Sequence, residues 1–458
     1  ERNWGYDGCY PYAVQHSYGG PLALKRFVDA CHAAGLAAVL DVVYNHLGPE
    51  GNHAGDFGPY FTDRYRTPWG PAINFDGPGS DEVKRFFIEN ALYWFREFHF
   101  DALRLDALHA ILDMSAEPFL ADLSTDVERL RKQTGRKLYL IGESDLNDPR
   151  LIREKARGGL GLHAQWSDDF HHSVHTLLTG ERDGYYADFG SVKHLAAAWC
   201  EGYCYSGQYS SFRQRSHGAP AADLPPWRFV ICSQNHDQVG NRAVGDRLST
   251  IVSLEKLKLA AACVLLSTHV PLLFMGEEYG ETAPFPYFVH HSDPALIDAV
   301  RKGRRAEFEG FNWQGEIPDP QEVGTFMSAR LKWDRRSEGH HGTLLSWYVE
   351  LLRRRRSEPL FTRGEPVEER VQVFEARKAL LVQRSGGGHR VAVAFNFGDS
   401  RWDADALLAA GRWNKVLDSA DVRWDGPGAV MPDVVDAKAK PLLRVAPYSV
   451  VVLSSEAK

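Results

Sequence analysis

Short apolar runs alternate with amphipathic stretches along most of this chain. The runs that predict buried strands cover residues 36–43, 101–105, 137–142, 161–166, 228–233 and 270–275. Between them, residues 22–34 and 81–98 repeat apolar side chains every three or four positions, the spacing of a helix packed on one face. Such alternation is typical of repeated β/α units around a parallel sheet.

The pattern changes after a helix predicted at residues 343–356. Short strands are expected at residues 371–374, 379–383, 391–397, 413–417 and 449–454, and three glycines at 386–388 mark a hairpin. We therefore expect an α/β domain over residues 1–357 and an antiparallel β-sandwich over residues 358–458. The apolar stretch 257–275 is interrupted by polar residues and Pro271, so a buried helix followed by a buried strand is expected there rather than a membrane span.

Six parallel strands are two fewer than a closed TIM-type (β/α)8 barrel contains. The chain opens on residues 4–20, a loop-like stretch rich in glycine, tyrosine and proline with no strand before it. We therefore expect the α/β domain to supply the third to the eighth strand of such a barrel, with the first two strands absent from this chain. A sheet of this kind leaves an unpaired strand edge.

The composition is that of an ordinary globular protein, with 458 residues, 44% hydrophobic, 25% charged and a net charge of −7. A mildly acidic chain lacks the basic surface that nucleic acids require, and the one basic run, residues 353–356, follows a helical pattern that predicts a solvated helix end. The six cysteines are scattered and predict free thiols, and residues 1–8 show no signal peptide. A cytoplasmic protein that binds neither nucleic acid nor membrane is expected.

Several of the predicted strands end in polar or acidic side chains. These residues are Asn45 and His46, then Asp106, then Glu143, and finally Asn235, His236 and Asp237. A buried strand has no packing reason to end on an acid, whereas the carboxyl ends of barrel strands are where active sites form. Two carboxylates from neighbouring strands are the groups that cleave a glycosidic bond.

Structural roles are open for some of these residues. Arg104 shares a strand face with Asp106, because side chains alternate along a strand. Asp41 and Asp106 could therefore pair with Arg104 or cap helices, and Asn45 could shape the loop after its strand. His109, which lies one turn beyond Asp106, suits the cleft and the start of a helix equally. Three acids at three strand ends nevertheless favour catalysis.

In order and spacing, these strand ends resemble the four signature regions of the α-amylase family of glycoside hydrolases. The resemblance implies a TIM-type barrel and hydrolysis with retention of anomeric configuration. It casts Asp106 as the nucleophile, Glu143 as the acid and base, and Asp237 as the residue that holds the distorted sugar. Arg104 would keep Asp106 ionised, and the histidines of these regions would bind hydroxyl groups near the cleaved bond.

Longer segments point to one branch of that family. They cover residues 44–52, 57–77, 143–150, 165–181 and 233–242, and they resemble enzymes that act on maltooligosyl trehalose. The resemblance implies hydrolysis of the α-1,4 bond next to the terminal trehalose unit, with related α-1,4-glucans as further ligands. A branching or debranching enzyme built on the same three acids, and an inactive sugar-binding scaffold, are the alternatives.

The resemblance also supplies candidates for substrate binding. They are Tyr6, Asn45, His46, Arg104, His109, Trp166, Asp168, Asp169, His171, His236, Gln238 and Arg242. Trp4, His172 and the acidic segment 277–281 are further candidates at the rim of the site. Ordinary loop packing is the alternative for each of them.

No metal site is expected in this chain. Residues 47–80 are short compared with the inserted domain that binds calcium in many amylases. The histidine pairs 171–172 and 290–291 lack the further ligands of a known metal site. We therefore expect neither a metal nor a cofactor.

Overall fold

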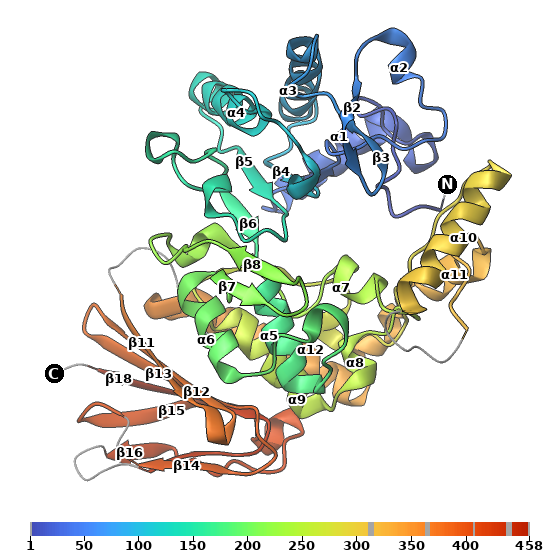
Figure 1. The fold of residues 1–458 in the computed structure, drawn as a ribbon. Helices are drawn as coiled ribbons and strands as arrows, with labels where there is room; N and C mark the ends of the chain where they lie inside the picture. Colours follow the sequence, from blue (N-terminus) through green and yellow to red (C-terminus); the bar gives the residue numbers. More distant parts are fainter. Residues whose placement is uncertain (1, 310–315, 362–366, 406–407, 437–441, 457–458) are drawn as a thin grey trace. The chain divides into compact units, whose positions relative to one another are not determined.

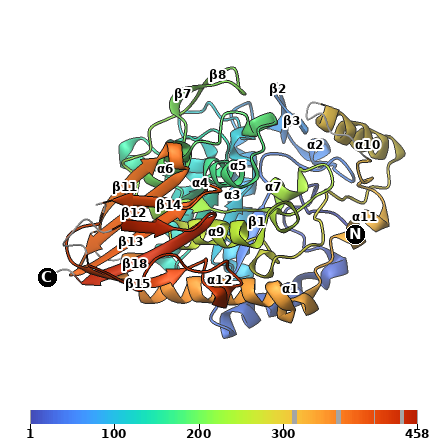
Figure 2. The same cartoon turned by 90° about the horizontal axis from the view of Figure 1, so that it is seen from below.

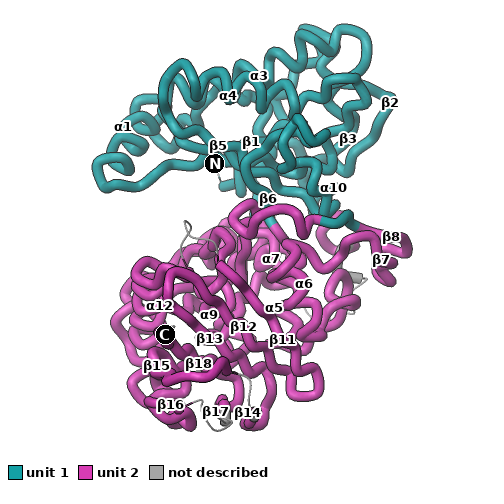
Figure 3. The backbone as a smooth tube through the Cα atoms, turned by 90° about the vertical axis from the view of Figure 1, so that its left-hand side faces the viewer, with its two compact units in different colours: residues 1–166, 218–220, 288–302 teal, residues 167–217, 221–287, 303–458 magenta. Residues whose placement is uncertain are grey.

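The computed structural model describes residues 2–309, 316–361, 367–405, 408–436 and 442–456. The chain divides into two compact units (Figure 3). Unit 1 contains Glu1–Trp166, Gly218–Pro220 and Phe288–Lys302, and unit 2 contains Ser167–His217, Ala221–Tyr287 and Gly303–Lys458. The domain boundary expected near residue 357 stays a prediction.

Four parallel strands form the centre of unit 1. They are β1 (Val39–Val42), β4 (Ala102–Leu105), β5 (Tyr139–Gly142) and β6 (Ala164–Trp166), paired in that order. Each lies inside a run that the sequence predicts as a strand. Val42 pairs with Leu105, which pairs with Gly142, so the carboxyl ends of three strands are level. Within the described residues β1 pairs with β4 alone, which leaves the expected open edge.

Helices α1 (Gly20–Ala33), α3 (Ser80–Glu97) and α4 (Phe119–Thr134) alternate with these strands. Helix α3 buries Val83, Phe87, Ala91 and Trp94, which repeat every three or four residues and so share one face. Figure 1 shows α3 and α4 side by side. Between β1 and α3 lie a short helix α2 (Ala54–Phe57) and the hairpin β2 (Phe61–Thr67) and β3 (Gly70–Ile73).

Unit 2 continues the alternation of strands and helices. Its first elements are α5 (Asp168–Thr179), α6 (Val192–Glu201), the hairpin β7 (Ser206–Ser210) and β8 (Arg215–Gly218), β9 (Phe229–Ile231), α7 (His236–Gly240) and α8 (Leu248–Ile251). They are followed by α9 (Leu254–Leu265), β10 (Val270–Pro271), α10 (Pro294–Glu309), whose first turns belong to unit 1, α11 (Val323–Ser328) and α12 (Gly339–Ser357). Strands β9 and β10 pair in parallel.

The apolar stretch 257–275 is a helix followed by a strand, as the sequence predicts. Helix α9 is buried on all sides from Leu259 to Leu265, which explains its uniform apolar character. Strand β10 is shorter than expected and ends at Pro271. No helix in the described part of the chain has the length and apolar character that a membrane crossing needs.

The end of the chain forms an antiparallel sheet. Its strands are β11 (Glu368–Phe374), β12 (Ala379–Gly386), β13 (His389–Asn396), β18 (Ser449–Glu456), β15 (Arg412–Asp418) and β16 (Val434–Asp436), in this spatial order. Figure 2 shows β11, β12, β13, β18 and β15 in turn. Strands β14 (Trp402–Asp405) and β17 (Leu442–Val445) form a second, two-stranded sheet. The five strands that the sequence predicts here are confirmed. The three others found in the described residues, β14, β16 and β17, were missed because they are only three or four residues long.

Candidate active site

The guanidinium of Arg104 joins three carboxylates at the ends of β1, β4 and β5. It lies 2.8 Å from Asp41 and 2.7 Å from Asp106, and its second amino group lies 3.4 Å from Glu143. Asp41 is the direct partner of Arg104 in the strand register. Two of the acids assigned to catalysis are therefore held by the same cation in unit 1.

The neighbouring acidic groups stabilise the positive charge of Arg104. Burial opposes the charge, but the surrounding acidic groups outweigh burial and hold the pKa of Arg104 well above its usual value. A permanent positive charge at this distance favours the ionised form of a carboxylate. The short contact with Asp106 suits the nucleophile role that the sequence predicts for this residue, and that role stays a prediction.

The backbone turn after β4 links Asp106 to Glu143. Ala107 has a φ of +43°, a left-handed conformation that is uncommon for a residue other than glycine. Its amide donates a hydrogen bond to Glu143 Oε2 at 2.6 Å, and the amide of Leu108 donates to the Glu143 carbonyl at 2.9 Å. The strained turn therefore brings the end of β4 and the end of β5 together.

Two aromatic rings flank the guanidinium. The ring of Trp166 lies 4.6 Å and the ring of Tyr6 lies 5.8 Å from its central carbon. The Tyr6 hydroxyl donates to Asp41 at 2.8 Å and also contacts Arg104 at 3.4 Å. Flat apolar faces beside a carboxylate cluster suit a sugar ring, whose C–H groups pack on aromatic surfaces.

His46 and Asn45 follow β1 into the same unit. The His46 ring stacks on Trp69 with centroids 4.7 Å apart and planes 7° from parallel. Burial lowers the pKa of His46, while Asp7 opposes this effect, so the imidazole is neutral near pH 7. Within the described residues, the side-chain amide of Asn45 is buried without a hydrogen-bond partner, and His46 is only 4% exposed. Trp69, in the β2–β3 turn, was missed by the sequence reasoning, since nothing local connects it to His46.

The third acid, Asp237, lies at the start of helix α7 in unit 2. Asn235 caps this helix by accepting a hydrogen bond from the Gln238 amide at 2.8 Å. The carboxylate of Asp237 is 41% exposed and lies 3.4 Å from His236 Nε2. The cap fixes the backbone turn that presents the acid.

Arg242, just beyond α7, is bound by two acids of unit 2. It donates paired hydrogen bonds to Glu181 at 2.8 and 3.0 Å and to Asp246 at 3.0 and 2.9 Å. His175 also contacts Glu181 at 2.8 Å. Burial would raise the pKa of Glu181, but these partners lower it far below its usual value. The arrangement makes Arg242 a structural support of the α7 loop, and its predicted contact with substrate stays a prediction.

Several candidates on helix α5 are occupied by internal contacts. Asp169 accepts hydrogen bonds from the amides of Cys204 and Tyr205 at 2.7 and 3.1 Å. His171 lies between the Ser233 carbonyl at 2.8 Å and the Tyr186 hydroxyl at 3.1 Å, and burial lowers its pKa well below the usual value. Such contacts favour positioning roles for these residues over contact with substrate.

The remaining candidates differ in exposure. Burial lowers the pKa of His172 to about 3, so this imidazole is neutral. His109 is one-third exposed, 3.7 Å from Asp145. Gln238 is buried on α7, and Asp168 begins α5. Their roles in substrate binding stay predictions.

The two ends of the acidic segment 277–281 are buried, so the expectation that they lie at a rim is wrong. Glu281 is fully buried and accepts hydrogen bonds from four groups, the Tyr279 hydroxyl and the amides of Thr282, Ala283 and Lys332. Glu277 is 5% exposed. Local sequence could not show this, because burial depends on the whole fold and one of the partners, the amide of Lys332, comes from a distant segment.

Metal ligands are not assembled in the described parts of the chain. No group of three or more histidine, cysteine, aspartate or glutamate side chains there could hold an ion. In these parts of the chain, neither the histidine pair 171–172 nor the pair 290–291 belongs to a group of three or more such side chains that could hold an ion. The expectation that the protein needs no metal stays a prediction.

Comparison with solved structures defines the class. No protein-family model matches the chain. The α-amylase of Geobacillus thermoleovorans has a TM-score of 0.63 at 16% identity, covering 98% of this chain and 84% of that one. A Salmonella typhimurium protein provisionally described as an α-amylase has a TM-score of 0.84 at 35% identity, covering 99% and 74%. The expected fold, a TIM-type barrel with a C-terminal antiparallel β domain, is confirmed, and the protein is a glycoside hydrolase of the α-amylase type.

Curated relatives narrow the assignment. The malto-oligosyltrehalose trehalohydrolase of Arthrobacter ramosus is 48% identical over 432 residues, 94% of this chain and 74% of its own length. The enzyme of the same name from Saccharolobus solfataricus is 48% identical over 356 residues, 78% of this chain and 60% of its own length. The chain belongs to the malto-oligosyltrehalose trehalohydrolase family. A Corynebacterium jeikeium branching enzyme is a distant relative at 24% identity, which weakens the branching alternative.

Proposed function

We propose that this protein hydrolyses the α-1,4-glucosidic bond next to the terminal trehalose of maltooligosyl trehalose and releases trehalose. The observation that carries the proposal is the single guanidinium that holds Asp106 and Glu143 together. The names of the relatives support the substrate. Related α-1,4-glucans, which lack the trehalose end, would bind more weakly.

The two carboxylates of unit 1 divide the chemistry between them. Ionised Asp106 attacks the anomeric carbon, and Glu143 gives its proton to the oxygen of the departing trehalose as that bond breaks. Glu143 then takes a proton from water, whose oxygen attacks the glycosyl–Asp106 ester and frees the carboxylate. Two displacements at one carbon retain its configuration. No metal or cofactor is needed, because water is the only other reactant.

The groups around the two acids supply binding and orientation. The rings of Tyr6 and Trp166 stack on the sugar next to the cleaved bond, and His46 binds one of its hydroxyls. Resemblance to the α-amylase family gives Asp237 the role of holding hydroxyls of a distorted sugar. We place the enzyme in the cytoplasm, where soluble glucans are its substrates.

Product analysis tests the proposal directly. The protein is incubated with maltooligosyl trehalose and, separately, with a branched glucan, and the products are separated by chromatography. Free trehalose from the first substrate is expected. Release of maltooligosaccharides from the second with no trehalose from the first would replace this function with that of a debranching enzyme.

A variant separates catalysis from binding. Glu143→Gln removes the acid but keeps the size and the hydrogen bond from Ala107, so kcat should fall on the order of 10³-fold while the Kd for substrate changes little. Glu82→Gln, a surface variant on α3, serves as the matched control. A Glu143→Gln enzyme with kcat within a few-fold of the parent would remove Glu143 from the mechanism.

A further inference from the structure

A short segment returns from unit 2 to unit 1 and contacts the loop that carries Tyr6. Residues 288–302 belong to unit 1, although the chain on both sides of them belongs to unit 2 (Figure 3). The first five of these residues, 288–292, have no regular secondary structure, and we call them the strap. Helix α10 begins two residues beyond the strap, at Pro294.

The strap is fastened by polar contacts around the buried side chain of His291. His291 is 7% exposed, and its Nδ1 lies 3.3 Å from Glu50 Oε2 while its Nε2 lies 3.9 Å from Asp7. The amide of Ser292 donates to the other Glu50 oxygen at 2.9 Å, and the Ser292 hydroxyl also donates to it. These hydrogen bonds lower the pKa of Glu50, so its carboxylate is ionised at neutral pH. At the other end of the strap, Phe288 packs edge-on against Trp4 at 6.4 Å.

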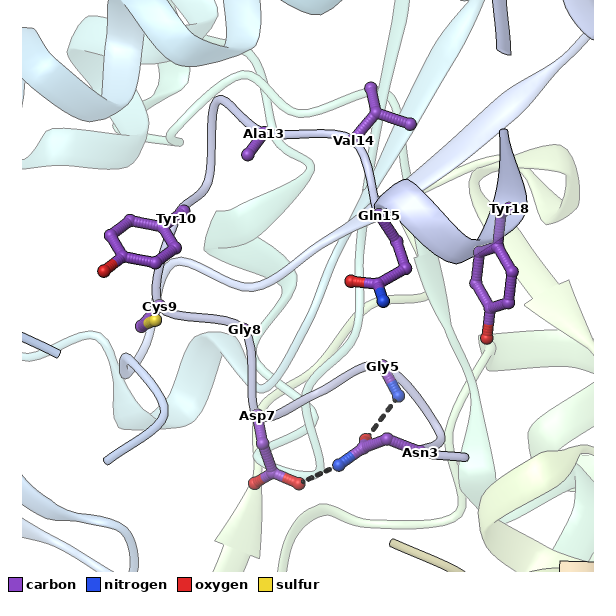
Figure 4. A pocket seen from close by; sticks show the side chains of 10 residues that line it. All are labelled: Asn3, Gly5, Asp7, Gly8, Cys9, Tyr10, Ala13, Val14, Gln15 and Tyr18. Carbon is purple, nitrogen blue, oxygen red and sulfur yellow. Dashed lines mark hydrogen bonds between the residues drawn. The ribbon is translucent and has the colours of Figure 1, made fainter. Parts of the chain in front are cut away.

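Residues 3–10, which we call the Tyr6 loop, are held against the same glutamate. Figure 4 shows Asn3 and Asp7 facing each other across this loop, joined at 2.8 Å, and the Gly5 amide donating to Asn3 at 2.7 Å. The Cys9 thiol donates to the Glu50 carbonyl at 3.3 Å. The loops around residues 8 and 48 touch backbone to backbone, because a Cβ on Gly48 would lie 1.8 Å from the Asp7 carbonyl oxygen.

The position of Tyr6 therefore depends on contacts made on either side of it in sequence. The Tyr6 loop has no helix or strand of its own, so its shape comes from Asn3, Asp7 and Glu50. The hydroxyl of Tyr6 reaches Asp41 and Arg104 at the reacting carboxylates. A shift of about 1 Å in such a group can cost on the order of 10²-fold in rate.

We propose that His291 and Glu50 are positioning residues of the enzyme: by fastening the strap to the Tyr6 loop, they hold the Tyr6 ring where it stacks on the sugar next to the cleaved bond. The proposal rests on the proposed function for its kinetic consequence. Its structural part, that the strap anchors the loop, stands without it. The two parts are tested by separate measurements.

Thiol labelling tests the anchoring. Burial raises the pKa of the Cys9 thiol, so this residue reacts slowly while the loop is held. His291→Leu should speed maleimide labelling of Cys9, followed by peptide mass spectrometry, by about fivefold or more through local opening. Cys200, which lies in unit 2, is the internal reference, and His290→Leu, a change at the exposed neighbour, should leave the Cys9 rate unchanged. An unchanged Cys9 rate in His291→Leu would overturn the anchoring.

A double-mutant cycle tests the route through Tyr6. His291→Leu should lower kcat/KM for maltooligosyl trehalose by about tenfold in the parent enzyme, and by less than about twofold once Tyr6→Ala has removed the ring. His291→Gln, which can still donate to Glu50, should recover most of the loss. An equal loss in both backgrounds would show that His291 does not act through Tyr6.

The two proposals fail in different ways. Failure of the proposed function appears as a parent protein that releases no trehalose, whatever the labelling shows. Failure of the present inference appears as an active parent enzyme in which His291→Leu leaves Cys9 labelling unchanged, leaves kcat/KM unchanged, or lowers kcat/KM equally with and without the Tyr6 ring. Circular dichroism of each variant establishes that the fold is retained.

Discussion

Glu277 offers a test of how burial sets protonation in this fold. Its carboxyl lies inside unit 2, 5% exposed, where Oε2 accepts a hydrogen bond from the Phe274 amide at 3.1 Å and Oε1 lies 3.1 Å from the Tyr348 hydroxyl. Burial raises the pKa of Glu277 to about 8, and the two hydrogen bonds only partly offset this. The folded protein therefore holds a proton on Glu277 at neutral pH.

The consequence for stability follows from proton linkage. In the unfolded chain the carboxyl titrates near 4.5, so between pH 4.5 and about 8 the folded state binds a proton that the unfolded state has lost. The free energy of unfolding then falls as the pH rises, by about 1.4 kcal/mol per pH unit, or roughly 3 kcal/mol by pH 7 and 5 kcal/mol above pH 8. A glutamine, which has the shape of the protonated acid and does not ionise, avoids this loss.

Urea unfolding followed by tryptophan fluorescence measures the effect. We expect Glu277→Gln to lie close to the parent protein near pH 5 and to exceed it by a growing margin, on the order of 4 kcal/mol, by pH 8. Glu82→Gln on the surface of α3 reports how the rest of the protein responds to pH. A stability difference between Glu277→Gln and the parent that is flat from pH 5 to 9 would refute the reasoning.

Three further predictions concern Arg104, the α7 cap and the C-terminal sheet. Arg104→Met should lower kcat on the order of 10²-fold and move the acidic limb of the pH–rate profile to higher pH, since the nucleophile loses the charge that favours its ionised form; an unmoved limb would exclude that role. Asn235→Ala should lower the free energy of unfolding by about 1 kcal/mol and speed hydrogen exchange of the Gln238 amide. Unchanged exchange would show that the cap is dispensable. Lys258 donates hydrogen bonds to the Ser419 and Trp424 carbonyls at 2.8 Å, and Lys258→Met leaves both carbonyls without this partner. Urea unfolding should therefore show a free energy of unfolding lower by about 1–3 kcal/mol. A stabilised variant would contradict this.

Much of the fold could be predicted from the sequence because strand and helix patterns are local. A strand buried on both faces must be apolar throughout, and a helix packed on one face must repeat every three or four residues. Those constraints located β1, β4, β5 and α3 within a few residues. They failed for β10, where the apolar run continues past Pro271 although the strand pairing ends there.

The candidate site was predictable to the same extent. An acid at the end of an apolar strand can be recognised in the sequence, which is why Asp106 and Glu143 were found. The sequence does not show whether a polar side chain contacts water or a buried hydrogen-bond partner. Asp169 looked like a candidate for the cleft and instead accepts two backbone amides inside the unit.

The sequence by itself determined the order of strands and helices, the acids at their ends and the family. Only the tertiary structure decided how those groups are used, because the partners are far apart in the chain. Glu50 and His291 are separated by 241 positions, yet they fasten one loop, and one guanidinium joins three strands. Protonation and orientation depend on such contacts, since burial and neighbouring charges act through space and not along the backbone.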